Sequence, residues 1–300
     1  MISNYSYFNN ALTKLVLVAA AVLLLTTNSP AQKNKKGLAA PVGPLLTRTV
    51  SRHEVVRRFG YGGTVTVVGA PHGSITIEGW AKNEVDITAE IEVQAPTEED
   101  LARLAAVNTF LLDDALNHLS VLTTGMHDRS YMRKAGKNFP KQLLSMPWKI
   151  DYRLRVPIAT QLEINGGIGA INLSGVEGAI RLGAPQTEAT LTFTGGVVTA
   201  TFAAGTINVH IPMRSWRGGG LDIQLATGDL NVELPAGFNG DIDAGILRTG
   251  KIENTYPDLE TRERTAFSEK SMQARAGAGG AFLKLSVGNG TIRLTKASPK

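Results

Sequence analysis

The sequence predicts an all-β protein built as a stack of short strands, a parallel β-solenoid or β-helix. Three observations predict this class. A nine-residue repeat runs from position 169 to position 211, apolar and polar residues alternate inside each repeat, and the 300 residues include 32 glycines but only 6% aromatic residues. Such a composition is typical of many tight turns between strands with small, β-branched core residues.

The repeat reads GAINLSGVE, GAIRLGAPQ, TEATLTFTG, GVVTATFAA and GTINVHIPM in successive steps of nine. In each step two apolar columns flank a polar one, as Ile171 and Leu173 flank Asn172 in the first. Successive side chains of a strand point to opposite faces, so this alternation predicts a strand with one buried face. The same column chemistry recurs in one direction along the chain, which favours parallel stacking.

A single nine-residue unit cannot be stable alone, because ordering its backbone costs more free energy than two buried apolar side chains return. Neighbouring units must therefore share a core, as in other repeat proteins. Nine residues fit one side of a two-sided or a three-sided coil. An antiparallel sandwich or barrel is the main alternative. Asn-Gly hairpin signals are mostly missing between the strands, and Asn289-Gly290 is one of the few.

The first 31 residues are typical of a secretory signal peptide. Their apolar run, Leu15 to Leu25, is too short to span a bilayer. The small residues Ser29 and Ala31 are suited to cleavage after Ala31. An uncleaved N-terminal anchor is the alternative. If the signal peptide is cleaved, the mature chain would carry no transmembrane span. It would lie in the periplasm, on the outer cell surface or outside the cell. The expected segments are a signal peptide (1–31), a linker (32–48), the β domain (49–295) and a frayed tail (296–300).

Four stretches interrupt the strand pattern. Thr97 and Asp100 form a capping-box pattern before apolar residues at helical spacing, which predicts one short helix near residues 97–108. Residues 125–146 are basic and irregular and predict a surface excursion. Residues 212–218 and 254–278 predict loops, and such loops are better candidates for function than the repeat itself.

The sequence contains no recognisable catalytic or metal-binding motif. It has no cysteine, which excludes disulfides, thiol nucleophiles and thiolate metal sites. Calcium-binding nonapeptide rolls need an aspartate where this chain has Ile171. The five histidines follow no metal-ligand spacing, and the formal charge of +5 is scattered, which argues against nucleic-acid binding. We therefore expect a non-enzymatic protein that needs no cofactor and no metal.

The candidate binding residues are Trp216, Arg214 and Arg217, in the inserted loop MRSWRGGG. An exposed tryptophan can stack on a sugar ring, and arginines bind anionic groups. A loop aromatic packed down onto the strands is the alternative interpretation. A polysaccharide-cleaving β-helix would instead use carboxylates on the repeat, for which the candidates are Asp222, Asp229, Asp241 and Asp243.

Several motifs together carry a family resemblance: GSITIEGW (Gly73 to Trp80), YRLRVP (Tyr152 to Pro157), many G-x-I-x-(I/L/V) steps, and Leu234-Pro235. Residues 50–295 thereby resemble the large bacterial family of adhesin-like proteins with β-strand repeats, related to the head domain of autotransporter adhesins. The resemblance implies an exported, solenoid-like domain of undefined biochemical role and supplies no catalytic residues. The expected partner is an envelope polymer, a glycan or another surface protein, and the alternative function is polysaccharide binding or cleavage.

Overall fold

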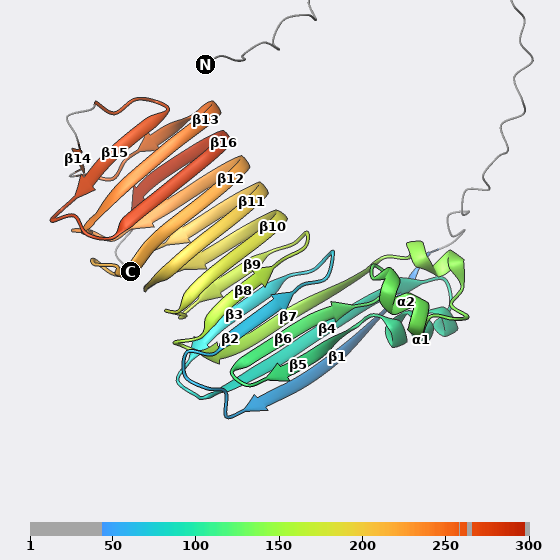
Figure 1. The fold of residues 1–300 in the computed structure, drawn as a ribbon. Coiled ribbons are helices and arrows are strands. Elements are labelled where there is room, and N and C mark those ends of the chain that lie inside the picture. Colours follow the sequence, from blue (N-terminus) through green and yellow to red (C-terminus); the bar gives the residue numbers. More distant parts are fainter. Residues whose placement is uncertain (1–43, 258, 263–265, 298–300) are drawn as a thin grey trace, which may run out of the picture. The chain divides into compact units, whose positions relative to one another are not determined.

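A computed structural model describes residues 44–257, 259–262 and 266–297 (Figure 1). The expected signal peptide and most of the expected linker lie outside these residues. Within them the chain is predominantly β, as predicted, and its sixteen strands join in one mixed sheet. No helix of the described part is long and apolar enough to cross a membrane.

The repeat block forms long strands that pair in parallel with a register of 18 residues. Ile171 lies beside Ala189, which lies beside Ile207. Two consecutive nine-residue units therefore make one layer, and the spacing excludes layers of three units. The strands of this block are β8 (Gln161–Asn165), β9 (Ile171–Ser174), β10 (Ala179–Thr192), β11 (Gly195–His210) and β12 (Arg217–Leu234).

Each long strand changes the face that it buries half-way along. In β11 the buried residues are even-numbered from Val198 to Phe202 and odd-numbered from Ile207 onward. Gly205 lies between them with φ 138°, a conformation that favours glycine. Thr187, which occupies the same column in β10, uses its hydroxyl to donate a 2.7 Å hydrogen bond to the carbonyl oxygen of Gly169 in the layer before.

The C-terminal strands depart from sequence order. The strand β16 (Phe282–Lys296) lies between β12 and β13 (Gly240–Asn254) and is parallel to both. The Asn289-Gly290 pair is therefore no hairpin turn; it sits inside β16 at the same break as Gly205. Residues 254–278 were expected to be a loop but contain β14 (Leu259–Thr261) and β15 (Ser271–Ala276), which pair antiparallel with each other.

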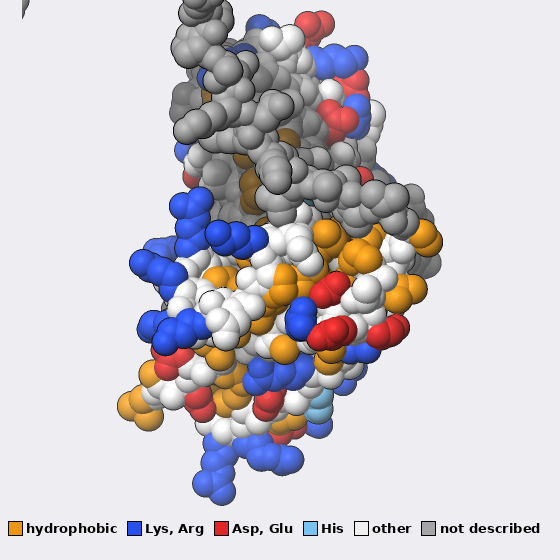
Figure 2. All heavy atoms as spheres, turned by 90° about the vertical axis from the view of Figure 1, so that its right-hand side faces the viewer, with side chains coloured by type: hydrophobic (Ala, Val, Ile, Leu, Met, Phe, Trp, Pro, Cys, Tyr) orange, Lys and Arg blue, Asp and Glu red, His pale blue; other side chains and the backbone are white. Residues whose placement is uncertain are grey.

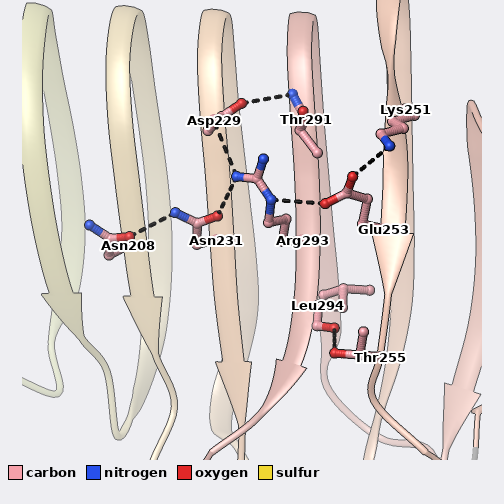
Figure 3. A network of polar contacts seen from close by, with 9 residues as sticks. All are labelled: Asn208, Asp229, Asn231, Lys251, Glu253, Thr255, Thr291, Arg293 and Leu294. Atoms are coloured by element: carbon pink, nitrogen blue, oxygen red, sulfur yellow. Dashed lines mark hydrogen bonds and ion pairs between the residues drawn. The ribbon is translucent and has the colours of Figure 1, made fainter.

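An ion and hydrogen-bond network joins β12, β16 and β13 on their solvent face (Figure 3). The guanidinium of Arg293, on β16, lies 3.0 Å from an Asp229 carboxylate oxygen on β12 and 2.9 Å from one of Glu253 on β13. Hydrogen bonds from Lys251 and Arg293 hold the pKa of Glu253 below its usual value. The network therefore ties the strand inserted out of order to both of its neighbours.

The N-terminal part of the sheet is mixed, so the expected uniformly parallel stack is wrong here. The outermost strand β1 begins at Leu46, inside the stretch expected to be linker, and pairs antiparallel with β4, which pairs antiparallel with β7. β7 and β6 then pair in parallel with β3 and β2. The strands are β1 (Leu46–Arg57), β2 (Thr64–Val68), β3 (Ile75–Trp80), β4 (Glu84–Ala95), β5 (Thr109–Ala115), β6 (His118–Thr124) and β7 (Trp148–Pro157).

Short helices occupy two of the interruptions. The predicted helix is α1 (Glu98–Val107), and the Thr97 hydroxyl accepts the amide of Asp100 at its N-terminus. Its apolar face, with Leu101 and Leu104 fully buried, packs into the common core. The excursion of residues 125–146 was expected to be irregular but contains a second helix, α2 (Arg129–Ala135), and a 3-10 helix at Lys141–Ser145.

Candidate functional site

Trp216 does not offer a stacking surface. Its side chain is only 7% exposed, its indole Nε1 donates a 3.0 Å hydrogen bond to the Gly196 carbonyl oxygen, and its ring centroid lies 6.2 Å from that of Phe193. Arg214 and Arg217 are exposed, and the Arg217 guanidinium lies 3.5 Å from Glu177. The loop aromatic is thus packed against the strands, and the two arginines remain as surface cations.

Three of the four candidate aspartates of the repeat region lie in ion pairs along the strands. Each of three carboxylates has a cation on a neighbouring strand: Asp222 has Lys284 at 3.5 Å, Asp229 has Arg293 at 3.0 Å, and Asp241 has Arg275 at 3.0 Å. Pairs of this kind add modest stability to the ladder. Among the described residues no ion pair is formed by Asp243, the fourth candidate. The described residues contain no group of three His, Asp or Glu side chains placed to hold a metal ion.

The most distinctive surface is a hollow of about 780 Å³ in the excursion between β6 and β7, which we call the basic hollow. Helix α2 places Arg129, Met132, Arg133 and Gly136 on one face, because residues three, four and seven positions apart lie above one another. The chain then returns beneath this face through the 3-10 helix. The residues that line the hollow are Met126, Arg129, Met132, Arg133, Gly136, Lys137, Phe139, Lys141 and Leu144.

The charge of this segment is strongly positive. Five cations and one acid lie within residues 125–146. The acid, Asp128, caps α2 by accepting the amides of Ser130 and Tyr131 at 2.8 and 3.1 Å. Hydrogen bonds lower the pKa of this carboxyl, and the bond from the Ser130 hydroxyl has the largest effect. Among the described residues no carboxylate pairs with any of the five cations, which are Arg129, Arg133, Lys134, Lys137 and Lys141.

Apolar side chains lie among these cations. Met126, Met132 and Phe139 are half-buried in the wall of the hollow, and Leu144 is 48% exposed. Figure 2 shows the face that carries α1 and α2: Lys and Arg side chains gather on its left, with apolar side chains beside them. A surface that combines unpaired cations with accessible apolar groups is suited to a ligand that is both anionic and partly apolar.

A second cleft, of about 580 Å³, adjoins the basic hollow and shares Met126 and Leu144 with it. On its wall the His127 and Trp148 rings lie 5.4 Å apart with 31° between their planes. Burial lowers the pKa of His127, so this imidazole is neutral at pH 7. The cleft also holds Lys149, whose ammonium lies 3.5 Å from Glu92 and 3.0 Å from Asp151.

Sequence reasoning found the basic character of this segment but missed its shape. Asp128 followed by two turns with Arg129, Met132 and Arg133 on one face is a signal for a capped amphipathic helix. The two turns are shorter than an ordinary helix, so the pattern is weak in the sequence alone. Lys141 and Leu144 complete the wall of the hollow. Their position depends on how the 3-10 helix packs, which the sequence does not show.

Comparisons with known proteins leave the function open. No protein-family model matches the chain, and no curated protein shows significant similarity to it. Among solved structures, a candidate cell adhesion protein from Clostridium sporogenes aligns with a TM-score of 0.43 and 10% identity over 83% of this chain and 100% of that one. A candidate adhesin from Bacteroides fragilis aligns with a TM-score of 0.34 and 11% identity over 83% and 97% of the two chains. These values are too low for either neighbour to inform on function.

Proposed function

We propose that this chain is an exported, non-enzymatic, adhesin-like scaffold that binds an anionic component of the cell envelope. In this proposal the parallel two-unit layers form a β-solenoid-like body, and the basic hollow is the binding site. The observation that carries the proposal is the set of four cations, without carboxylate partners among the described residues, that line the hollow together with apolar side chains. The secretory character of the first 31 residues supports an envelope location.

A rigid β body suits this role, because it holds a surface site without needing a catalytic pocket. Clustered cations attract anionic partners over a distance of about one Debye length. Binding should therefore weaken steeply as salt is added. No reaction is required of the residues that line the hollow, and we expect a bound polymer to be released with its chain length unchanged.

Retention of the full chain on immobilised dextran sulfate, compared with neutral dextran, tests this function. The R129E/K141E variant reverses two cations that line the hollow. Both positions lie in the first turn of a helical segment, where a carboxylate is compatible with the helix dipole, so we expect the fold to persist. The matched control, R248E/K296E, likewise reverses one exposed arginine and one exposed lysine, elsewhere on the domain.

We expect the wild-type chain and the control to be retained and R129E/K141E to elute at much lower salt. Equal elution of all three would exclude the hollow as the binding site. Shortening of the polymer by the wild-type chain, measured as new chain ends, would contradict a non-enzymatic role.

The second candidate function is polysaccharide binding in the adjoining cleft. It is favoured by the Trp148 ring, which lines this cleft together with the polar side chains of Glu92 and Gln94. Neutral glycans in a binding array distinguish the two functions. Binding that is lost in Trp148→Ala and kept in R129E/K141E would support the glycan site.

A further inference from the structure

We infer that the basic hollow docks onto the surface of a bilayer that contains anionic phospholipid. The inference rests on the proposed function and specifies its partner. A bilayer surface presents phosphate groups directly above an apolar layer, and a protein that binds there needs cations and exposed apolar side chains on one face. A flexible polyanion needs the cations alone.

The apolar part of the surface distinguishes these two partners. Leu144 is 48% exposed on the 3-10 helix that also carries Lys141, and a soluble polyanion would gain nothing from this apolar side chain. Helix α2 buries none of its residues in the domain core, so its Met132 is free to contribute to a contact outside the protein. Four cations and four large apolar side chains share this one hollow: Arg129, Arg133, Lys137 and Lys141, with Met126, Met132, Phe139 and Leu144.

The path of the chain places the hollow near the point where the β domain begins. The first residue of β1, Leu46, pairs with Ala95, the last residue of β4. Two residues earlier in β4, Val93 pairs with Trp148, which lines the cleft beside the hollow.

Acidic groups do not cancel this charge. Within the excursion the single carboxylate, Asp128, is held at the N-terminus of α2 by backbone amides. In the adjoining cleft Glu92 has Lys149 as a partner at 3.5 Å. The net positive charge of the hollow is thus available to lipid phosphates.

Co-sedimentation of the full chain with vesicles tests the inference. Vesicles of phosphatidylcholine alone are compared with vesicles that also contain phosphatidylglycerol, at one ionic strength. Every variant carries the same N-terminal apolar segment, so binding to the zwitterionic vesicles is the baseline for each. We expect the wild-type chain to bind the anionic vesicles at least about tenfold more tightly than the baseline. R129E/K141E should lose this preference and R248E/K296E should keep it.

Leu144→Gln separates a bilayer from a polyanion, because it changes no charge. We expect about fivefold weaker binding to anionic vesicles and unchanged retention on dextran sulfate. The side chain is exposed, and circular dichroism verifies that the fold is kept.

Retention on dextran sulfate without a preference for anionic vesicles would overturn the bilayer as the partner and leave the proposed function standing. If the wild-type chain showed neither retention on dextran sulfate nor a preference for anionic vesicles, the bilayer assignment and the proposed function would both be overturned. Equal loss of vesicle and dextran sulfate binding in Leu144→Gln would also overturn the bilayer assignment.

Discussion

Glycines at the break in each long strand allow the layers to approach closely. Gly205, Gly228, Gly290 and Gly250 lie beside one another in β11, β12, β16 and β13, with φ between 134° and 142°. A Cβ at any of them would collide with the carbonyl oxygen of the preceding residue in this column. Thr187 interrupts the column with a side chain that bonds to Gly169, so this layer is joined by a hydroxyl contact.

Replacing Gly228 with alanine should destabilise the domain by about 1–3 kcal/mol, since the backbone must be strained or the Gly205 carbonyl displaced. Urea unfolding monitored by circular dichroism measures the change. Gly245→Ala is the control: its Cβ would meet nothing within 4 Å. Similar losses in both variants would show that close approach at the break is not the cause.

Tyr152 makes stability depend on pH in the alkaline range. Its side chain is 2% exposed, its hydroxyl lies 2.7 Å from that of Thr123, and burial raises its pKa to about 12 from the usual value of 10. The folded state therefore holds the phenolic proton more tightly than the unfolded state. This contribution is complete below pH 10 and is lost as the pH rises from 10 to 12.

The Tyr152→Phe variant has no such proton. It should be about 1 kcal/mol less stable at pH 7, through the lost hydrogen bond, and should show a flatter decline in unfolding free energy above pH 10. Urea unfolding at a series of alkaline pH values gives both numbers. Parallel declines for the two proteins would contradict the pKa assigned to Tyr152.

At the scale of elements, β16 is the strand whose position is least expected. It follows β13 in the chain but lies between β12 and β13 in the sheet. Its inner face is the usual alternation of buried residues, Leu283, Leu285, Val287, Ile292 and Leu294. Its outer face carries Arg293, which forms ion pairs with carboxylates on both neighbouring strands (Figure 3).

Arg293→Met should lower the unfolding free energy by no more than about 1 kcal/mol, because the side chain is 38% exposed and solvent screens its ion pairs. The loss should shrink at high salt. Arg181→Met, which removes one 3.6 Å ion pair from an 80% exposed side chain, is the matched control and should have a smaller effect. A salt-independent loss in Arg293→Met would indicate that packing of its aliphatic chain is responsible.

At the scale of the whole molecule, one sheet joins all the described strands, and the order of its strands decides what each contributes. Ending the chain at residue 278 removes β16, which pairs in parallel with both β12 and β13, and leaves each of these two strands with one unpaired edge. Unpaired edges are prone to aggregation. We expect this truncation to lose cooperative unfolding and to aggregate, whereas ending the chain at residue 297 should preserve both fold and solubility.

Thermal unfolding and size-exclusion chromatography of the two truncated chains distinguish the outcomes. A cooperative transition in the chain that ends at residue 278 would show that β13 can pair with β12 directly. The repeat would then tolerate sequential stacking in place of the observed order.

The candidate site was only partly predictable. The basic composition of residues 125–146 is visible in the sequence, and so is the lack of catalytic motifs. The expected binding residue Trp216 is buried, and the sequence could not show this. Its hydrogen-bond partner Gly196 lies 20 residues earlier in the chain and becomes adjacent only through strand pairing. The expectations of export and of a non-enzymatic role stay predictions.

The sequence by itself determined the β class, the two apolar columns of each repeat, the helix capped by Thr97 and the positive charge of the excursion. These features are local, since side-chain alternation and capping depend on residues a few positions apart. The tertiary structure alone decided the 18-residue register, the insertion of β16 and the closure of the basic hollow. The nine-residue pattern fits a layer of two units as well as one of three, and the inner face of β16 fits several places in the stack. Which strands become neighbours is settled only when all the layers share one core and one hydrogen-bonded ladder.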